Sequence, residues 1–256
     1  MLYLIGLGLW DEKDITLKGL EIARSCEKVY LEHYTSVLAG TSKEKIEELI
    51  GKKIIELDRK AVEEEAKFID EAKEQDVALL VAGDPLVATT HWDLLVRAME
   101  KGIDYRIIHN ASIYSAVAET GLQIYKFGRT ATVVFWEDNY KPTSFFDVIK
   151  ENKKQGLHTL LLLDIRPRKL MSPNHAIKAL IEIEPAFKKE KIVVLSRAGS
   201  PRPGIVYGEA NRLLERDFGD GPHVLIVPGT LHHMEMEVLE RLNIRENPKG
   251  LNNRSS

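Results

Sequence analysis

The sequence reads VALLVAGDPLVATTH from Val77 to His91. It opens with an unbroken apolar run, which is typical of a strand buried on both faces of a sheet. The run stops at Gly83-Asp84-Pro85, because glycine permits a tight turn and proline cannot extend a strand. A threonine, Thr89 or Thr90, can then cap a following helix. The stretch therefore predicts a strand, a sharp polar turn and a helix.

Asp84 is the charged residue of this turn. In open α/β sheets, ligands bind just beyond the carboxyl ends of the strands, which is where Asp84 falls. Its carboxylate can accept hydrogen bonds from an ammonium or hydroxyl group of a ligand. The alternative is a turn aspartate that bonds its own backbone. The residue types alone leave both roles open.

The same alternation of strand and helix continues on both sides of this stretch and predicts an α/β fold. Strands are expected at 2–9, 28–32, 53–57, 77–82 and 105–109, with an amphipathic helix over 59–74. A second series begins at 130–135 and continues at 158–164, 191–196 and 223–228. We therefore predict two α/β domains, 1–110 and 111–256, with a polar tail over 243–256 that frays.

Composition limits the classes of function. The formal net charge of −3 implies no broad basic face, so we expect no direct binding of nucleic acid. No apolar run approaches the roughly 20 residues that span a bilayer, and the start lacks the basic residues of a signal peptide. The single cysteine, Cys26, rules out an internal disulfide and a thiolate-rich metal site. We expect a cytoplasmic protein without membrane contact.

Other strand ends carry polar or small residues. Gly6-Leu7-Gly8 resembles the start of a dinucleotide fingerprint, but Asp11 stands where the third glycine belongs. These glycines more simply let another backbone or a ligand approach the strand end. Ser112 begins a helix of small and hydroxyl residues just after a strand. No metal-binding motif is present, and the histidines are mostly expected to be structural. The pattern predicts a small-ligand cleft between two domains.

Several stretches together resemble the archaeal diphthine synthases, methyltransferases with the fold of the tetrapyrrole methylases. GDPLVATTH at 83–91 is the most specific of them, since Gly-Asp-Pro alone is shared by the wider superfamily. The others, which span almost the whole chain in order, include IGLGLWD (5–11), YTS (34–36), ASIYSA (111–116), YKFG (125–128), HTLL (158–161), RAGS (197–200), DFG (217–219) and HVL (223–225).

The resemblance implies a class III methyltransferase that binds S-adenosylmethionine between its two domains and releases S-adenosylhomocysteine. It implies a homodimer and, as protein substrate, translation elongation factor 2, whose modified histidine is methylated successively on its amino group during diphthamide biosynthesis. It assigns no catalytic residue and no metal. The cofactor-binding residues that it implies are Leu9, Asp84, Val87, Ser112, Ile113, Leu163, Ala198 and His223.

Two alternatives remain open on the sequence. One is a tetrapyrrole methyltransferase that acts on a planar macrocycle, and the other is a non-catalytic protein that binds the same cofactor. The segments 136–140 and 166–171 match no fixed motif, so the contacts to the substrate are not predicted.

Overall fold

The computed structural model describes residues 1–32, 34, 37–166 and 169–246, with side chains described up to residue 242. It divides into two units, Met1–Ala116 and Val117–Ser256, each of which is described by itself. The sequence places the boundary slightly earlier, at residue 110. Most of the predicted polar tail lies outside the described residues, but its first four positions belong to the last helix.

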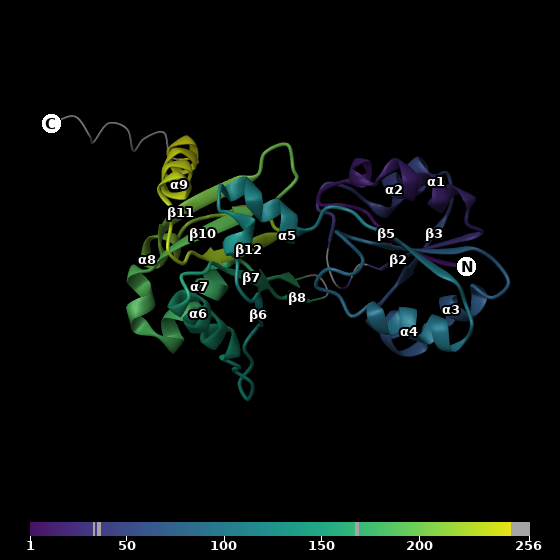
Figure 1. The fold of residues 1–256 in the computed structure, drawn as a ribbon, viewed down its shortest axis with the longest axis horizontal. Coiled ribbons are helices and arrows are strands. Elements are labelled where there is room, and N and C mark those ends of the chain that lie inside the picture. The colour runs from purple at the N-terminus through teal and green to yellow at the C-terminus, as the bar shows by residue number, and fades with distance from the viewer. Residues whose placement is uncertain (33, 35–36, 167–168, 247–256) are drawn as a thin grey trace. The chain divides into compact units, whose positions relative to one another are not determined.

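The first unit contains a five-stranded parallel sheet with the strand order β3-β2-β4-β1-β5. Helices α1 and α2 cover one face of the sheet, and α3 and α4 cover the other (Figure 1). This is the predicted alternation of strand and helix. The elements are β1 (Leu2–Gly6), α1 (Leu17–Ser25), β2 (Lys28–Glu32), α2 (Lys43–Ile50), β3 (Ile54–Leu57), α3 (Lys67–Glu71), β4 (Val77–Val81), α4 (Trp92–Glu100), β5 (Tyr105–Ile108) and α5 (Ile113–Ala116).

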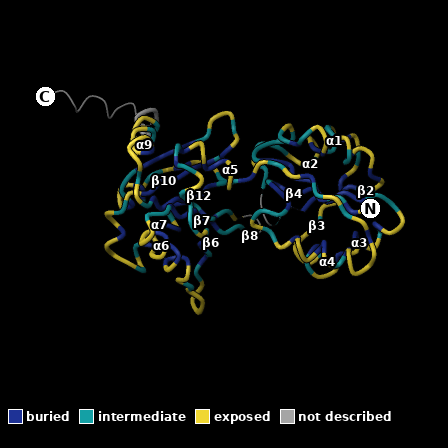
Figure 2. The backbone as a smooth tube through the Cα atoms, in the orientation of Figure 1, coloured by how far each residue is buried: buried dark blue, intermediate teal, exposed yellow. Residues whose placement is uncertain are grey.

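Strand β4 lies at the centre of this sheet, and all 5 of its residues are buried. Leu79 packs with Phe68 on one face, whereas Leu80 packs with Ile46 on the other. An unbroken apolar run is what a strand covered on both faces requires. Figure 2 shows buried strands and exposed outer helices and loops in this unit. The predicted buried strand is confirmed.

The second unit contains a mixed sheet with the strand order β11-β10-β12-β7-β6. Only β6 and β7 pair in parallel, and the remaining pairs are antiparallel. Helices α6, α7 and α8 contribute to the apolar core of this unit, and α9 packs against β11. The elements are β6 (Ala131–Val133), α6 (Ser144–Lys154), β7 (Thr159–Leu163), β8 (Ile165–Arg166), β9 (Lys169–Leu170), α7 (Pro173–Ile183), β10 (Lys191–Ser196), β11 (Gly204–Glu209), α8 (Ala210–Leu213), β12 (His223–Val227) and α9 (His233–Glu246).

Two local predictions are wrong. The helix expected over 59–74 is interrupted, since a π-helical turn, η2 (Ala61–Glu65), ends at Ala66, whose φ is 45°. Neither threonine caps α4: the Thr89 hydroxyl donates to Pro85 O at 2.7 Å. Thr90 contacts a glutamate of η2 instead. The bond of Thr89 is local to the turn, whereas the contact of Thr90 is a tertiary one that replaces the expected cap.

Candidate functional site

The glycines near the ends of β1 and β4 allow these two chain segments to touch. Gly83 N–H donates to Gly8 O at 2.7 Å, and Gly8 N–H donates to Gly83 O at 3.2 Å. A Cβ atom placed on Gly6 would lie 2.6 Å from Gly83 O, so only glycine fits at this position. The expectation that these glycines permit the close approach of another backbone is confirmed.

Asp84 is 5% exposed, and protein donors occupy its carboxylate. Oδ1 accepts from Leu86 N–H at 3.0 Å, which is the aspartate turn expected from local chemistry. Oδ2 accepts from His109 Nδ1 at 2.8 Å and from Asn110 N–H at 3.1 Å, beyond the end of β5. A carboxylate has about four acceptor positions, so little of this one remains for a ligand. Asp84 therefore joins the ends of two strands.

Asn110 and Asp14 hold the loop that carries Leu9. The side-chain amide of Asn110 donates to Gly6 O at 2.9 Å and to Asp14 O at 3.0 Å. The Asp14 carboxylate accepts from Leu9 N–H at 3.2 Å and from Trp10 N–H at 2.7 Å. Sequence reasoning missed both roles, because nothing in the local pattern shows that these residues meet.

Ser112 directly precedes α5, which begins at Ile113, and lies next to the turn after β4. A Cβ atom placed on Gly83 would meet Ser112 Cβ at 4.0 Å, an ordinary van der Waals distance, so Ser112 lies close beside the turn. Within the described residues, Ser112 is hydrogen-bonded through its backbone alone, and its hydroxyl is left for a ligand. Half-buried Val87 lies on the same turn. The first unit thus brings together all five of the candidate residues that it contains.

The second unit brings together the other three candidates at one edge of its sheet. Leu163 ends β7, Ala198 follows β10, and His223 begins β12. Since β12 runs antiparallel to both neighbours, its start lies beside their ends. His223 Nδ1 lies 2.8 Å from Ser196 Oγ. Burial lowers the pKa of His223 and the nearby cation of Arg197 lowers it further, so the imidazole is neutral near pH 7.

Arg197 fixes the loop that carries Ala198. Its φ is 53°, a left-handed conformation that costs a non-glycine residue roughly 1–2 kcal/mol. Its guanidinium donates to Phe218 O at 3.0 Å and to Asp220 O at 2.8 Å, which ties the loop to the segment before β12. Two of the motifs that the sequence singled out, RAGS and DFG, therefore meet in the structure.

Comparison with known proteins identifies the family. The family model for Tetrapyrrole (Corrin/Porphyrin) Methylases matches residues 1–214. The diphthine synthase of Methanocaldococcus jannaschii is 52% identical over 253 residues, which cover 94% of this chain and 98% of that protein. That of Methanococcus aeolicus is 50% identical over 96% of this chain and 100% of the relative. The chain belongs to the diphthine synthase family of tetrapyrrole methylases.

A solved structure agrees with this assignment. A crystal structure of diphthine synthase superposes with a TM-score of 0.89 at 43% identity, covering 94% of this chain and 95% of the other. The predicted fold class is confirmed, and the protein is a methyltransferase of this family.

Two of the family motifs, YKFG and HTLL, meet away from the candidate site. The buried Glu235 of α9 accepts from Gln123 N–H at 2.9 Å, from His158 Nε2 at 3.0 Å and from Lys126 Nζ. His158 in turn accepts from Gly229 N–H at 2.9 Å through Nδ1. Burial opposes ionisation of Glu235, but the hydrogen bonds from Lys126 and from backbone N–H groups outweigh it and lower its pKa to about 2. This clamp is structural, because its polar groups satisfy one another.

Two kinds of feature are absent from the described residues. No group of three His, Cys, Asp or Glu residues in this part of the chain is arranged to hold a metal ion. Nor does any helix within it have the length and apolar character needed to cross a bilayer.

Proposed function

We propose that this protein methylates translation elongation factor 2 during diphthamide biosynthesis. The acceptor is the amino group of 2-(3-amino-3-carboxypropyl)histidine, which is methylated successively. The observation that supports this most is the similarity to diphthine synthases over nearly the full length of both chains. The Gly83–His91 stretch that carries the resemblance forms a fixed turn at a strand end, where ligands of α/β proteins bind.

The proposed cofactor is S-adenosylmethionine, and the residues present fit it. The Ser112 hydroxyl, which makes no hydrogen bond within the described residues, and half-buried Val87 suit a ligand with both polar and apolar parts. The proposed binding residues are Leu9, Asp84, Val87, Ser112 and Ile113 on the first unit and Leu163, Ala198 and His223 on the second.

The chemistry makes few demands on protein side chains. When bound, S-adenosylmethionine supplies an electrophilic methyl group on a sulfonium. The protein has to hold the lone pair of the acceptor amine in line with that methyl, a proximity effect that needs no protein nucleophile. Neutral His223 and the backbone groups of the Asp84 turn bind and orient without adding charge. We assign no general base.

A methyl-transfer assay tests the proposal. Purified protein with labelled S-adenosylmethionine is offered either elongation factor 2 that carries the unmethylated histidine derivative or a porphyrinoid. We expect label only on the elongation factor, at the amino nitrogen of that residue. Label on the porphyrinoid would indicate a tetrapyrrole methyltransferase, and no transfer at all would indicate a non-catalytic binding protein. Either result would overturn the proposal.

The remaining expectations follow from the same assignment. We propose a homodimer that acts in the cytoplasm, where its protein substrate takes part in translation. The net charge of −3 gives no support to direct contact with nucleic acid.

A further inference from the structure

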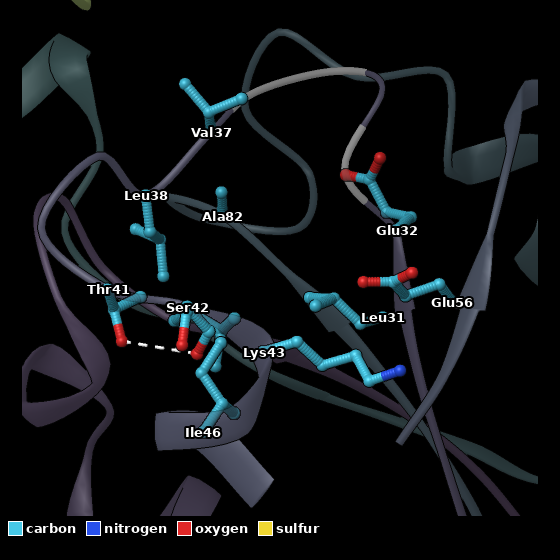
Figure 3. A pocket seen from close by; sticks show the side chains of 11 residues that line it. Leu31, Glu32, Val37, Leu38, Thr41, Ser42, Lys43, Ile46, Glu56 and Ala82 are labelled. Carbon is cyan, nitrogen blue, oxygen red and sulfur yellow. Dashed lines mark hydrogen bonds between the residues drawn. The ribbon is translucent and has the colours of Figure 1, made fainter.

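A cavity of about 170 Å³ lies at the strand ends of the first unit, outside the set of proposed cofactor residues. Leu31, Leu38 and Ile46 supply part of its apolar wall (Figure 3). For scale, an engineered cavity of roughly 150 Å³ in another protein holds a benzene molecule. The cavity is therefore large enough for a short aliphatic or small cyclic group.

Three charged side chains face this cavity. Glu32 ends β2 and is 1% exposed, and its Oε2 accepts from Tyr34 N–H at 3.2 Å. Exposed Glu56 comes from β3, and Lys43 begins α2. Figure 3 shows both carboxylates and the ammonium group on the same side of the cavity, across from Val37.

In the part of the chain that the structure describes, Lys43 and Glu56 have no bonded protein partner, although Glu44 and Glu47 interact with the Lys43 charge along the helix. Within the described residues, neither side chain makes an ion pair or a hydrogen bond. These two opposite charges lie on one cavity and are complementary to a ligand that carries both a carboxylate and an ammonium group. The apolar wall suits the carbon chain of such a ligand.

The cavity adjoins the segments proposed to bind the cofactor. Leu7 and Ala82 line it, and each lies shortly before a proposed cofactor residue in the sequence, Leu9 and Asp84. The backbone bridge between Gly8 and Gly83 joins these two segments. A group held in the cavity would therefore lie close to the cofactor turn.

We propose that this cavity binds an α-amino-acid head group. Lys43 pairs with its carboxylate, Glu56 pairs with its ammonium group, and the apolar wall packs on the methylenes. This inference rests on the proposed function, in which two molecules carry such a group. One is the acceptor, through its 3-amino-3-carboxypropyl arm, and the other is the cofactor, through its methionine tail.

The test uses two substitutions that keep the length of the side chain, Lys43→Met and Glu56→Gln. Lys45→Met and Glu48→Gln are matched controls, since both residues are exposed on the same helix and do not line the cavity. Calorimetry with S-adenosylhomocysteine reports cofactor affinity, and methyl transfer to elongation factor 2 reports kcat/KM. Lys43→Arg keeps the cation and should behave like the parent.

If the acceptor arm is the occupant, both substitutions lower kcat/KM for the elongation factor by about tenfold or more, while the Kd of S-adenosylhomocysteine stays constant. If the cofactor tail is the occupant, that Kd rises by about tenfold. Unchanged constants, or equal changes in the controls, would overturn the inference while leaving the proposed function intact. Failure of the parent protein to transfer methyl groups would instead contradict the proposed function.

Discussion

The Asp84 carboxylate bonds both to the backbone of its own turn and to residues beyond the end of another strand. The turn sequence Gly83-Asp84-Pro85 predicts a local bond from the carboxylate to the backbone, and Leu86 N–H supplies it. Ligand binding is the other role that the sequence leaves open. The bonds to His109 and Asn110 were not foreseen, because these residues come from a different strand end. The side chain is therefore part of the framework of the site.

The first prediction concerns Asp84→Asn. From the sequence alone we expect weaker cofactor binding with little loss of stability, since water would reach the group in the empty protein. Because the side chain is only 5% exposed in the structure, we expect the substitution to reduce stability as well. Losing one charge-assisted bond should lower the free energy of unfolding by about 1.5–3 kcal/mol. Calorimetry should show this loss, and the Kd of S-adenosylhomocysteine should rise because the bonds from His109 and Asn110 that hold the turn are weakened.

Asp104→Asn is the matched control, because that side chain is exposed and far along the chain from the turn. It should change neither quantity. A fully stable Asp84→Asn variant with the parent's affinity would show that Asp84 is dispensable in both roles.

Helix α9 is fixed by a polar clamp whose members come from separate elements. Lys126 precedes β6, His158 precedes β7, and Glu235 lies on α9 itself. The sequence shows YKFG and HTLL as motifs but does not show that both meet one buried carboxylate. In the structure, both motifs therefore help to hold α9 in place within the second unit.

The second prediction follows from the pKa of Glu235, which is about 2 in the folded protein and 4.5 when exposed. A lowered folded pKa stabilises the protein above pH 4.5, and this contribution is lost as the pH falls towards 2. It amounts to about 3 kcal/mol. Glu235→Gln should therefore be less stable than the parent at pH 7, and the gap should narrow between pH 5 and pH 2 in denaturant titrations. A difference in stability between the parent and Glu235→Gln that does not change with pH would contradict the stabilising role of the Glu235 charge.

For the whole molecule, the prediction is the homodimer that the family resemblance implies. One chain has a mass of 29.0 kDa, so light scattering at micromolar concentration should give about twice that value. A mass that stays at that of one chain over the accessible concentration range would contradict the dimer. This measurement tests only the oligomeric state, because all of the proposed cofactor residues belong to a single chain.

The sequence by itself determined the α/β class, the buried strand β4 with its turn, and the family, because these depend on local apolar runs, turn residues and contiguous motifs. It missed the antiparallel pairing of the second sheet and strand β11, since strand direction depends on how distant segments pack. It also missed the break at Ala66 and the bonds of Asn110 and Arg197. The tertiary structure alone decided which strand-end residues meet and which charges stay unpaired, because both depend on contacts between residues far apart in the chain.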